Sequence, residues 1–325
     1  IIDEILILDS NWRSAKSNLD NIASQMNNIS KEIGILFREG KKDEANEAKA
    51  KTGDLKIQES DLKASVVELE KSIALLMYQL PNVPSEPVVI GHGENENELL
   101  FENGEIKTYN FKPLPHWELT EKYDIIDFEL GVKLTGAGFP VYKGKGAKLQ
   151  RALIAFFLDE AVNAGYVEHQ PPLLVNEASG LGTGQLPDKE GQMYHIGEDD
   201  LYLIPTAEIP LTNIYRNVLL PDDKFSIKIT GYTPCFRREA GSYGKDVRGL
   251  NRLHQFDKVE IVRIEHPDNS TDALEEMMNH VKSLLEKLGL HYRVLRLCGG
   301  DTGFAAAMTY DFEVYSAAQE KWLEV

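Results

Sequence analysis

Residues 225–264 read FSIKITGYTPCFRREAGSYGKDVRGLNRLHQFDKVEIVRI and contain the clearest strand pattern of the chain. Two runs rich in β-branched and aromatic residues, 225–237 and 251–264, flank a loop rich in glycine and charge. The loop leaves no room for a crossover helix, so the two runs are predicted to pair as antiparallel strands. An α+β fold with an antiparallel hairpin at its centre is therefore expected.

One face of this hairpin is predicted to carry the chemistry, because successive side chains of a strand point to opposite faces. The second run thereby brings together Arg252, His254, Phe256, Lys258 and Glu260. Arg237 and Glu239 share a face of the first run in the same way. Two arginines, a lysine, two glutamates and an aromatic ring suit a polyanion with a planar base, together with a small zwitterion. The alternative is a solvated sheet face with incidental ion pairs.

Composition limits the class of protein. Hydrophobic residues make up 42% of the chain, which is ordinary for a globular protein with a sizeable core. No run of about 18 apolar residues is present, so no membrane span is expected. The acidic N-terminus does not resemble a secretory signal, and the two cysteines, Cys235 and Cys298, lack metal-site or disulfide spacing. A cytoplasmic location is expected.

The charge balance does not favour nucleic acid as a partner. The chain has 35 basic and 52 acidic residues, a net charge of −17. Proteins that contact phosphate backbones normally present basic surfaces. A local basic patch remains compatible with this balance.

A heptad pattern runs through the first 80 residues. Apolar residues with alternating spacings of three and four are Leu8, Trp12, Ala15, Leu19, Ile22, Met26, Ile29, Ile33 and Leu36. The pattern resumes after Gly40 at Ala45, Ala48, Leu55, Leu62, Val66, Leu69, Ile73, Leu76 and Leu80, with Thr52 and Glu59 as polar interruptions. Such spacing predicts two antiparallel helices of about 30 residues, each about 45 Å long. A dimerisation or spacer coil is one interpretation of this arm.

The remaining chain divides into a linker and a mixed domain. Prolines and glycines punctuate residues 81–93, so we expect an arm at 1–80, a linker at 81–99 and a second domain at 100–325. Residues 147–163 form a predicted helix that is apolar on nearly all sides, which implies that more than its own sheet covers it. A short strand at 166–170 follows and ends at Pro171.

A strand-to-helix turn after residues 201–204 holds further polar candidates. Thr206 can cap the helix that follows, with Pro210 in its first turn. Glu208 offers a carboxylate that can receive the ammonium group of an amino acid. Beyond it we expect a helix at 271–288 and strands at 291–297 and 310–315.

These motifs together resemble a known family. FRREAG at 236–241, RGL at 248–250, HQF at 254–256 and KVE at 258–260 resemble motif 2 of the class II aminoacyl-tRNA synthetases, in the form found in seryl-tRNA synthetases. The helix, strand and proline that begin at residue 147 are similar to motif 1, which implies a homodimer. GTGQLP at 182–187 is also similar to the seryl enzymes.

The resemblance implies an activity and its partners. It implies the class II antiparallel sheet flanked by helices, and activation of L-serine by ATP with Mg²⁺ to seryl-adenylate. It further implies transfer to tRNA(Ser), and to tRNA(Sec) where that pathway exists, with the arm reaching the tRNA. Candidate tRNA contacts near the turn of the arm are Arg38, Lys41 and Lys42.

Roles for individual residues follow from the resemblance and from their chemistry. The guanidinium of Arg237 fits the α-phosphate and the attacking carboxylate, and Arg252 is a second catalytic cation. The implied ATP-binding set is Arg237, Arg238, Glu239, Phe256, Glu324 and Val325, with Glu324 as the Mg²⁺ ligand. The implied serine-binding set is Thr206, Ala207, Glu208, Arg237 and Glu260, with Glu260 accepting the serine hydroxyl.

Other interpretations remain. The chain can be a class II homologue that charges a carrier other than tRNA, or an inactive binding protein. Cys235 lies beside two arginines, which would lower its thiol pKa, although no histidine partner is evident. No P-loop is present, and no GxGxxG follows a strand, which argues against doubly wound nucleotide folds. The resemblance also implies a motif 3 segment beyond Val325.

Overall fold

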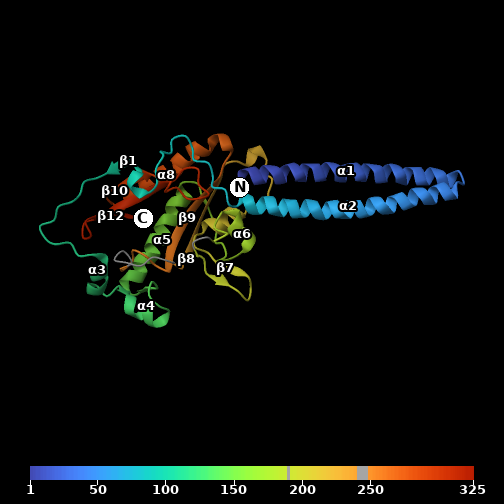
Figure 1. Ribbon diagram of the computed structural model, residues 1–325. Helices are drawn as coiled ribbons and strands as arrows, with labels where there is room; N and C mark the ends of the chain where they lie inside the picture. Colours follow the sequence, from blue (N-terminus) through green and yellow to red (C-terminus); the bar gives the residue numbers. More distant parts are fainter. Residues whose placement is uncertain (189–190, 240–247) are drawn as a thin grey trace. The chain divides into compact units, whose positions relative to one another are not determined.

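The computed structural model describes residues 1–188, 191–239 and 248–325, which form two compact units, Ile1–Pro81 and Asn82–Val325. The first unit is a hairpin of α1 (Ile2–Arg38) and α2 (Lys42–Met77), as Figure 1 shows. Gly40 makes the tight turn between them in the left-handed region, at φ +78°. The predicted pair of long antiparallel helices is confirmed.

The heptad residues of the arm form its seam. Ala15, Ile22, Ala45, Ala48 and Val66 are buried between the helices. Each of the other predicted seam positions is at least partly buried. The polar interruptions bond within their own helix: Thr52 donates to the Ala48 carbonyl at 3.1 Å, and Lys63 to Glu59 at 2.8 Å. The helices have 37 and 36 residues, longer than predicted: α1 begins at Ile2, ahead of Leu8, and α2 begins at Lys42, ahead of Ala45, but ends at Met77, before Leu80.

A four-stranded antiparallel sheet forms one part of the second unit. Its order is β1 (Glu98–Asn103), β10 (Tyr292–Arg296), β11 (Tyr310–Ser316) and β12 (Lys321–Glu324). Helix α8 (Ser270–Lys287) packs Met278, Val281 and Leu285 against Tyr292, Val294 and Phe312 of this sheet. β10, β11 and α8 lie close to the segments predicted for them, whereas β1 and β12 were not predicted.

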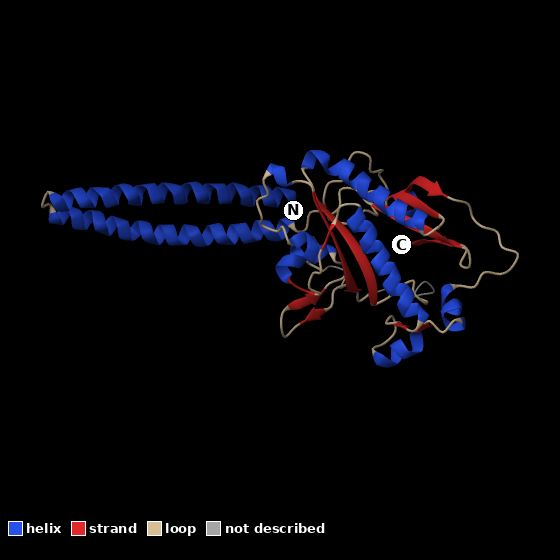
Figure 2. Ribbon diagram, turned by 180° about the vertical axis from the view of Figure 1, so that it is seen from behind, coloured by secondary structure: helices blue, strands red, loops and turns tan. Residues whose placement is uncertain are grey.

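The predicted hairpin forms the second part. β8 (Ile227–Phe236) and β9 (Gln255–Ile264) pair antiparallel over ten residues without a register shift, and β4 (Val167–Glu168) pairs parallel to β8. Helix α5 (Lys145–Asn163) lies along this hairpin (Figure 2). The hairpin prediction is confirmed, although loop residues 240–247 lie outside the described residues.

The strands of the hairpin end earlier than predicted. Arg237 and Glu239 follow β8, and Arg252 and His254 precede β9. The ladder stops because the His254 N–H donates to the Gly138 carbonyl instead of to β8, and because Glu239 has a positive φ of 49°. Strand alternation therefore does not extend to Arg252, His254 and Glu239, so it does not determine the face on which each of them lies.

Small elements complete the second unit. Two further groups of short strands are β5 (Leu174–Asn176), β7 (Leu201–Leu203) and β6 (His195–Ile196), and β2 (Ile126–Asp127) with β3 (Val141–Tyr142). The short helices are α3 (His116–Lys122), α4 (Phe128–Leu134), α6 (Glu177–Gly182) and α7 (Glu208–Asn213). Ile204 and Ile209 are fully buried in a core with Val175, Leu186 and Met193, which fixes the turn between β7 and α7.

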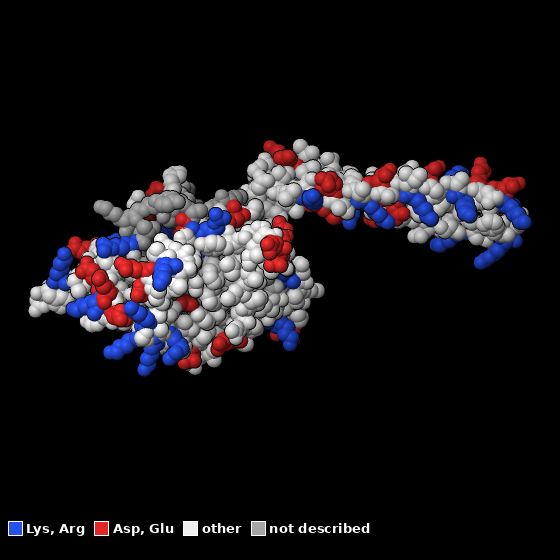
Figure 3. Space-filling model, turned by 90° about the horizontal axis from the view of Figure 1, so that it is seen from below, with Lys and Arg blue, Asp and Glu red and all other residues white. Residues whose placement is uncertain are grey.

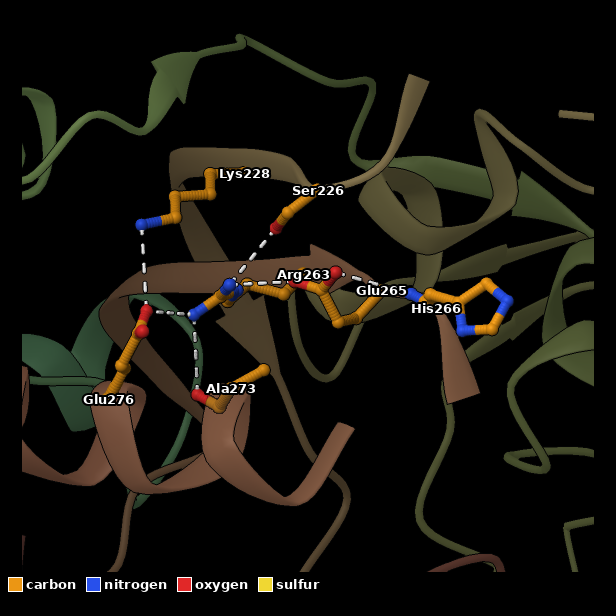
Figure 4. A network of polar contacts seen from close by, with 7 residues as sticks. All are labelled: Ser226, Lys228, Arg263, Glu265, His266, Ala273 and Glu276. Carbon is orange, nitrogen blue, oxygen red and sulfur yellow. Dashed lines mark hydrogen bonds and ion pairs between the residues drawn. The ribbon is translucent and has the colours of Figure 1, made fainter. Parts of the chain in front are cut away.

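A buried arginine ties the end of β9 to α8 (Figure 4). Arg263 donates to Ser226 at 3.0 Å, to Glu265 at 2.7 Å and to Glu276 of α8 at 2.5 Å. Its side chain and that of Glu265 are both less than one tenth exposed. The buried charge of Arg263 is thus paired with Glu265, and its contact with Glu276 joins the end of β9 to α8.

Among the described residues, no helix is both long and apolar enough to cross a membrane. Along the arm, Lys and Arg alternate with Asp and Glu on the face that Figure 3 shows. On this face of the arm, acidic side chains are thus interleaved with basic ones.

Candidate active site

Arg237 is held at the end of β8 against an aromatic ring of β9. Its guanidinium carbon lies 5.1 Å from the centre of the Phe256 ring. The Arg237 N–H donates to the His254 carbonyl at 3.0 Å, and the Arg237 carbonyl accepts from His254 Nδ1 at 2.9 Å. His254 in turn stacks on Phe139 with ring centres 5.4 Å apart. These contacts fix the backbone from which the guanidinium projects.

Glu239 and Arg252 meet although neither lies in a strand. Arg252 Nη1 donates to Glu239 Oε2 at 3.1 Å. The carboxylate side chain is 10% exposed and the arginine side chain 54%, so the cation remains open to a ligand. Arg238 is exposed, and its N–H donates to the Gln192 carbonyl at 2.8 Å. Arg237, Arg238, Glu239 and Phe256 of the predicted ATP-binding set thus lie at one end of the hairpin, whereas Glu324 and Val325 lie at the end of β12.

A polar triangle joins β9 to the turn before α7. Thr206 Oγ1 donates to Glu260 Oε2 at 2.8 Å. Lys258 Nζ lies 2.8 Å from the same oxygen and donates to Thr206 Oγ1 at 3.2 Å. Thr206 is 4% exposed and the Glu260 side chain 18%, so the hydroxyl and the carboxylate are mostly shielded from water, whereas the Lys258 side chain is 36% exposed. Charge-assisted bonds in such surroundings are short and directional.

Thr206 also supports the helix. Its Oγ1 accepts the N–H of Glu208 at 3.3 Å, while Ala207 is the N-cap residue of α7. The prediction that Thr206 is the N-cap residue is therefore off by one position, because the N-cap is Ala207. The Ala207 side chain is fully buried in the core, so only its backbone can face a ligand.

Glu208 offers an accessible carboxylate beside the triangle. Burial of the carboxyl, and secondarily the negative charge of Glu260, raise its pKa, while Lys258 opposes this. The residue as a whole is exposed, so solvent screens part of this effect and a solute can reach the carboxylate.

Lys258 is absent from the sets of ATP-binding and serine-binding residues expected from the sequence. Strand alternation places it on the same face of β9 as Glu260, two residues earlier, but does not indicate a role for it. Its contact with Thr206 depends on a segment 52 residues away, and no local pattern indicates it.

Glu324 and Val325 lie at the end of β12, in the four-stranded sheet. Glu324 is paired in register with Glu313. Burial, and then the charges of Glu324, Asp301 and Glu313, raise the pKa of Asp311 to about 6. Negative charge therefore accumulates here, which suits a divalent cation, although the described residues contain no cluster of three or more ligands close enough to hold a metal.

The candidate tRNA contacts lie at the turn of the arm. Arg38 ends α1 and Lys42 begins α2, and both are exposed. Lys41 lies between them in an exposed ion pair with Glu39 at 2.9 Å.

Cys235 is not an activated thiol. It is fully buried, and its Sγ lies 3.4 Å from Thr233 Oγ1. Burial raises the pKa of the Cys235 thiol, and this outweighs the opposing effects of Thr233, Lys258 and Arg237. The expectation that the neighbouring arginines give this thiol a lowered pKa is wrong. Burial destabilises the thiolate more than the positive charge of Arg237 stabilises it.

Both cysteines are therefore expected to resist alkylation. Cys235 and Cys298 are buried, so iodoacetamide at pH 7.5 should react at least about 100-fold more slowly with the folded protein than with the protein in denaturant. The check is mass spectrometry of thiol adducts over time. Rapid labelling of Cys235 in the folded protein would contradict its burial.

Comparison with known proteins defines the class. Residues 193–325 match the tRNA synthetase class II core domain (G, H, P, S and T), and residues 1–84 match the Seryl-tRNA synthetase N-terminal domain. The hairpin with its arginines is thus part of a class II aminoacyl-tRNA synthetase core.

Full-length relatives define the family. The serine–tRNA ligase of Salinibacter ruber (strain DSM 13855 / M31) is 51% identical, over 100% of this chain and 76% of its own length. That of Methanosarcina barkeri (strain Fusaro / DSM 804) is 42% identical, again over 100% of this chain and 76% of its own. The crystal structure of seryl-tRNA synthetase from Pyrococcus horikoshii complexed with ATP superposes with a TM-score of 0.89 at 32% identity, covering 100% of this chain and 76% of that one.

This chain belongs to the serine–tRNA ligase family. Members of the family activate serine with ATP and then transfer it to tRNA. The predicted family and fold class are confirmed.

Proposed function

We propose that this chain activates L-serine at the end of the β8–β9 hairpin and transfers it to tRNA(Ser). The observation that carries the proposal is the arrangement along β9. Phe256 lies under the Arg237 guanidinium, and Lys258 and Glu260 follow on the same face with Thr206 bonded to both. A planar base, a phosphate and a small polar amino acid fit in that order along one wall.

The first step joins two anions. The serine carboxylate attacks the α-phosphorus of ATP, an oxygen–phosphorus bond forms, and pyrophosphate leaves. Such transfers depend mainly on position and on stabilisation of phosphoryl charge. Arg237 is assigned to the α-phosphate and the carboxylate, with Arg252 and Arg238 as further phosphate ligands. Phe256 stacks on adenine, and Glu239 accepts from its amino group.

Serine is recognised by the polar triangle. Glu260 accepts from the serine hydroxyl, and Thr206 and Lys258 hold the carboxylate of Glu260 in place. Glu208 and the backbone at Ala207 receive the ammonium group. An acceptor built for a hydroxyl rejects alanine, because it would then remain unpaired.

Glu324 is assigned to Mg²⁺. When bound, the cation would neutralise phosphate oxygens during displacement. Burial is the main cause of the raised pKa of Asp311, and the negative charges of Glu324, Asp301 and Glu313 add to it; a cation would relieve this second contribution. The cation site is thus proposed because carboxylate oxygens are suitable ligands and because several acidic side chains lie close together here.

A homodimer is proposed through α5 and β4. Leu149 and Val162 of α5 and Val167 of β4 are largely exposed apolar side chains on the motif 1 elements. A second copy of the chain would cover them, as the apolar character of the helix requires.

The arm is assigned to tRNA(Ser), and to tRNA(Sec) where a cell has it. Replacement of Arg38, Lys41 and Lys42 together by alanine is expected to lower kcat/KM for tRNA charging about 10-fold, because phosphate contacts are lost. Serine-dependent pyrophosphate exchange should not change. The control is the triple alanine variant of Lys107, Lys112 and Lys133, which are exposed and lie outside the arm. This variant loses the same amount of positive charge at another place. Equal effects of the two triples on charging would contradict a specific role of the turn.

The deciding experiment is amino-acid-dependent ATP–pyrophosphate exchange by the full-length protein with each of the twenty amino acids, followed by charging of total tRNA. Exchange with serine and charging of tRNA(Ser) are expected. Exchange with another amino acid would overturn the specificity. Exchange without tRNA charging would favour a different carrier, and a folded protein without exchange would favour a binding protein. A cytoplasmic location is proposed with this function, and the free cysteines agree with a reducing compartment.

A further inference from the structure

The end of the loop that returns to β9 is held by α3, an element outside the motifs discussed so far. The N–H of Leu250 donates to Nε2 of His116, the first residue of α3, at 2.7 Å. A ring nitrogen that accepts a hydrogen bond has a free lone pair, so His116 must be neutral when it binds Leu250. Burial lowers the pKa of His116, which favours this form.

Close approach of the backbone supports this contact. Gly249 has a φ of +73°, and a Cβ at that position would lie 2.2 Å from His116 Nε2. Only glycine allows the chain to pass the imidazole so closely in this conformation. The backbone at Gly249 and the imidazole of His116 are thus closely packed, and the hydrogen bond from Leu250 is part of this packing.

A second contact holds the same segment. The Arg248 guanidinium carbon lies 4.9 Å from the centre of the Trp117 ring, and the His116 and Trp117 rings meet edge to face at 5.0 Å. Trp117 and Arg248 line a cavity of about 530 Å³ that Arg252 also lines. Three consecutive residues, 248–250, are thus fixed on two neighbouring aromatic side chains.

Arg252 is two residues beyond Leu250 and bonds to Glu239. Since Arg252 lies outside β9, the sheet does not fix its position. On the side of the loop, the contacts of residues 248–250 with α3 restrain this segment, together with Asn251, whose Nδ2 donates to Gln319 Oε1 at 3.3 Å.

We propose that neutral His116 is a positioning residue that fixes Leu250 and thereby places the Arg252–Glu239 pair for ATP. This rests on the proposed ATP-binding role of that pair. His116 touches neither substrate; it acts through the loop end. Loss of the acceptor should weaken ATP binding and leave serine binding unchanged, because the Thr206–Glu260 triangle lies on other elements.

The test compares three variants of His116 in the full-length protein. A Gln side chain can place its amide oxygen near the position of Nε2, whereas that of Asn reaches only the position of Nδ1, and Phe keeps the ring without an acceptor. His116→Phe and His116→Asn are expected to raise KM for ATP about 10-fold, with KM for serine within twofold of wild type. His116→Gln should restore most of the ATP affinity.

Amide hydrogen exchange supplies a readout that needs no activity. Leu250 should exchange about 10-fold faster in His116→Phe than in wild type, and close to the wild-type rate in His116→Gln. Unchanged exchange at Leu250 in His116→Phe would overturn the contact. Faster exchange with an unchanged KM for ATP would overturn the positioning role. Equal losses for ATP and serine in all three variants, with lowered thermal stability, would indicate a merely structural residue and also overturn it. Failure of the proposed function would appear separately, as absence of serine-dependent exchange in the wild-type protein.

Discussion

Replacement of Arg237 by alanine is expected to lower serine-dependent pyrophosphate exchange by about 100- to 1,000-fold. The reaction brings the serine carboxylate to a phosphate, and the guanidinium is the cation placed beside the Phe256 ring where that charge would develop. Binding of ATP should weaken less than the rate falls, because the interaction strengthens in the transition state. Steady-state exchange with varied ATP and serine separates these two effects.

Two variants make this test specific. Arg237→Lys keeps the charge but not the paired donors, so it should recover only part of the rate. Arg238→Ala removes an exposed neighbour and should cost about 10-fold or less. The backbone contacts of Arg237 with His254 do not involve the guanidinium, so circular dichroism and thermal unfolding should match wild type. Nearly full activity in a folded Arg237→Ala protein would contradict the assignment of Arg237 to the α-phosphate.

Replacement of Glu260 by alanine is expected to lower kcat/KM for serine by about 1,000-fold and to leave that for alanine almost unchanged. The carboxylate is the acceptor proposed for the serine hydroxyl, and Thr206 and Lys258 both contact its Oε2 atom. Its loss removes the hydroxyl partner and leaves Lys258 without this counter-charge. Discrimination between serine and alanine should therefore collapse, as measured by exchange with each amino acid.

Conservative variants separate recognition from folding. Glu260→Gln keeps the shape of the side chain and should give an intermediate loss, and Thr206→Val should raise KM for serine by releasing Glu260 from its donor. Glu275→Gln, on an exposed position of α8, is the matched control and should behave as wild type. If Glu260→Ala discriminated against alanine as strongly as wild type does, another residue would have to read the hydroxyl.

Local patterns were sufficient for the arm and the hairpin. The heptad spacing identified the buried seam from Leu8 to Leu76, because helix geometry repeats over a few residues. The hairpin and the common face of Phe256, Lys258 and Glu260 followed from strand alternation in the same way. The alternation rule does not apply to Arg252 and Glu239, because β8 ends before Glu239 and β9 begins after Arg252.

The two-helix arm, the antiparallel hairpin, the family and the candidate residue types of the site could be predicted from the amino-acid sequence, since each depends on short-range periodicity or on motifs. Which of these residues contact one another became evident from the folded chain alone. Thr206 bonds to Glu260 across 54 residues, and His116 to Leu250 across 134. The raised pKa of the Cys235 thiol likewise comes from burial under distant segments. Contacts of this kind depend on how the whole chain packs, and no pattern within one segment encodes them.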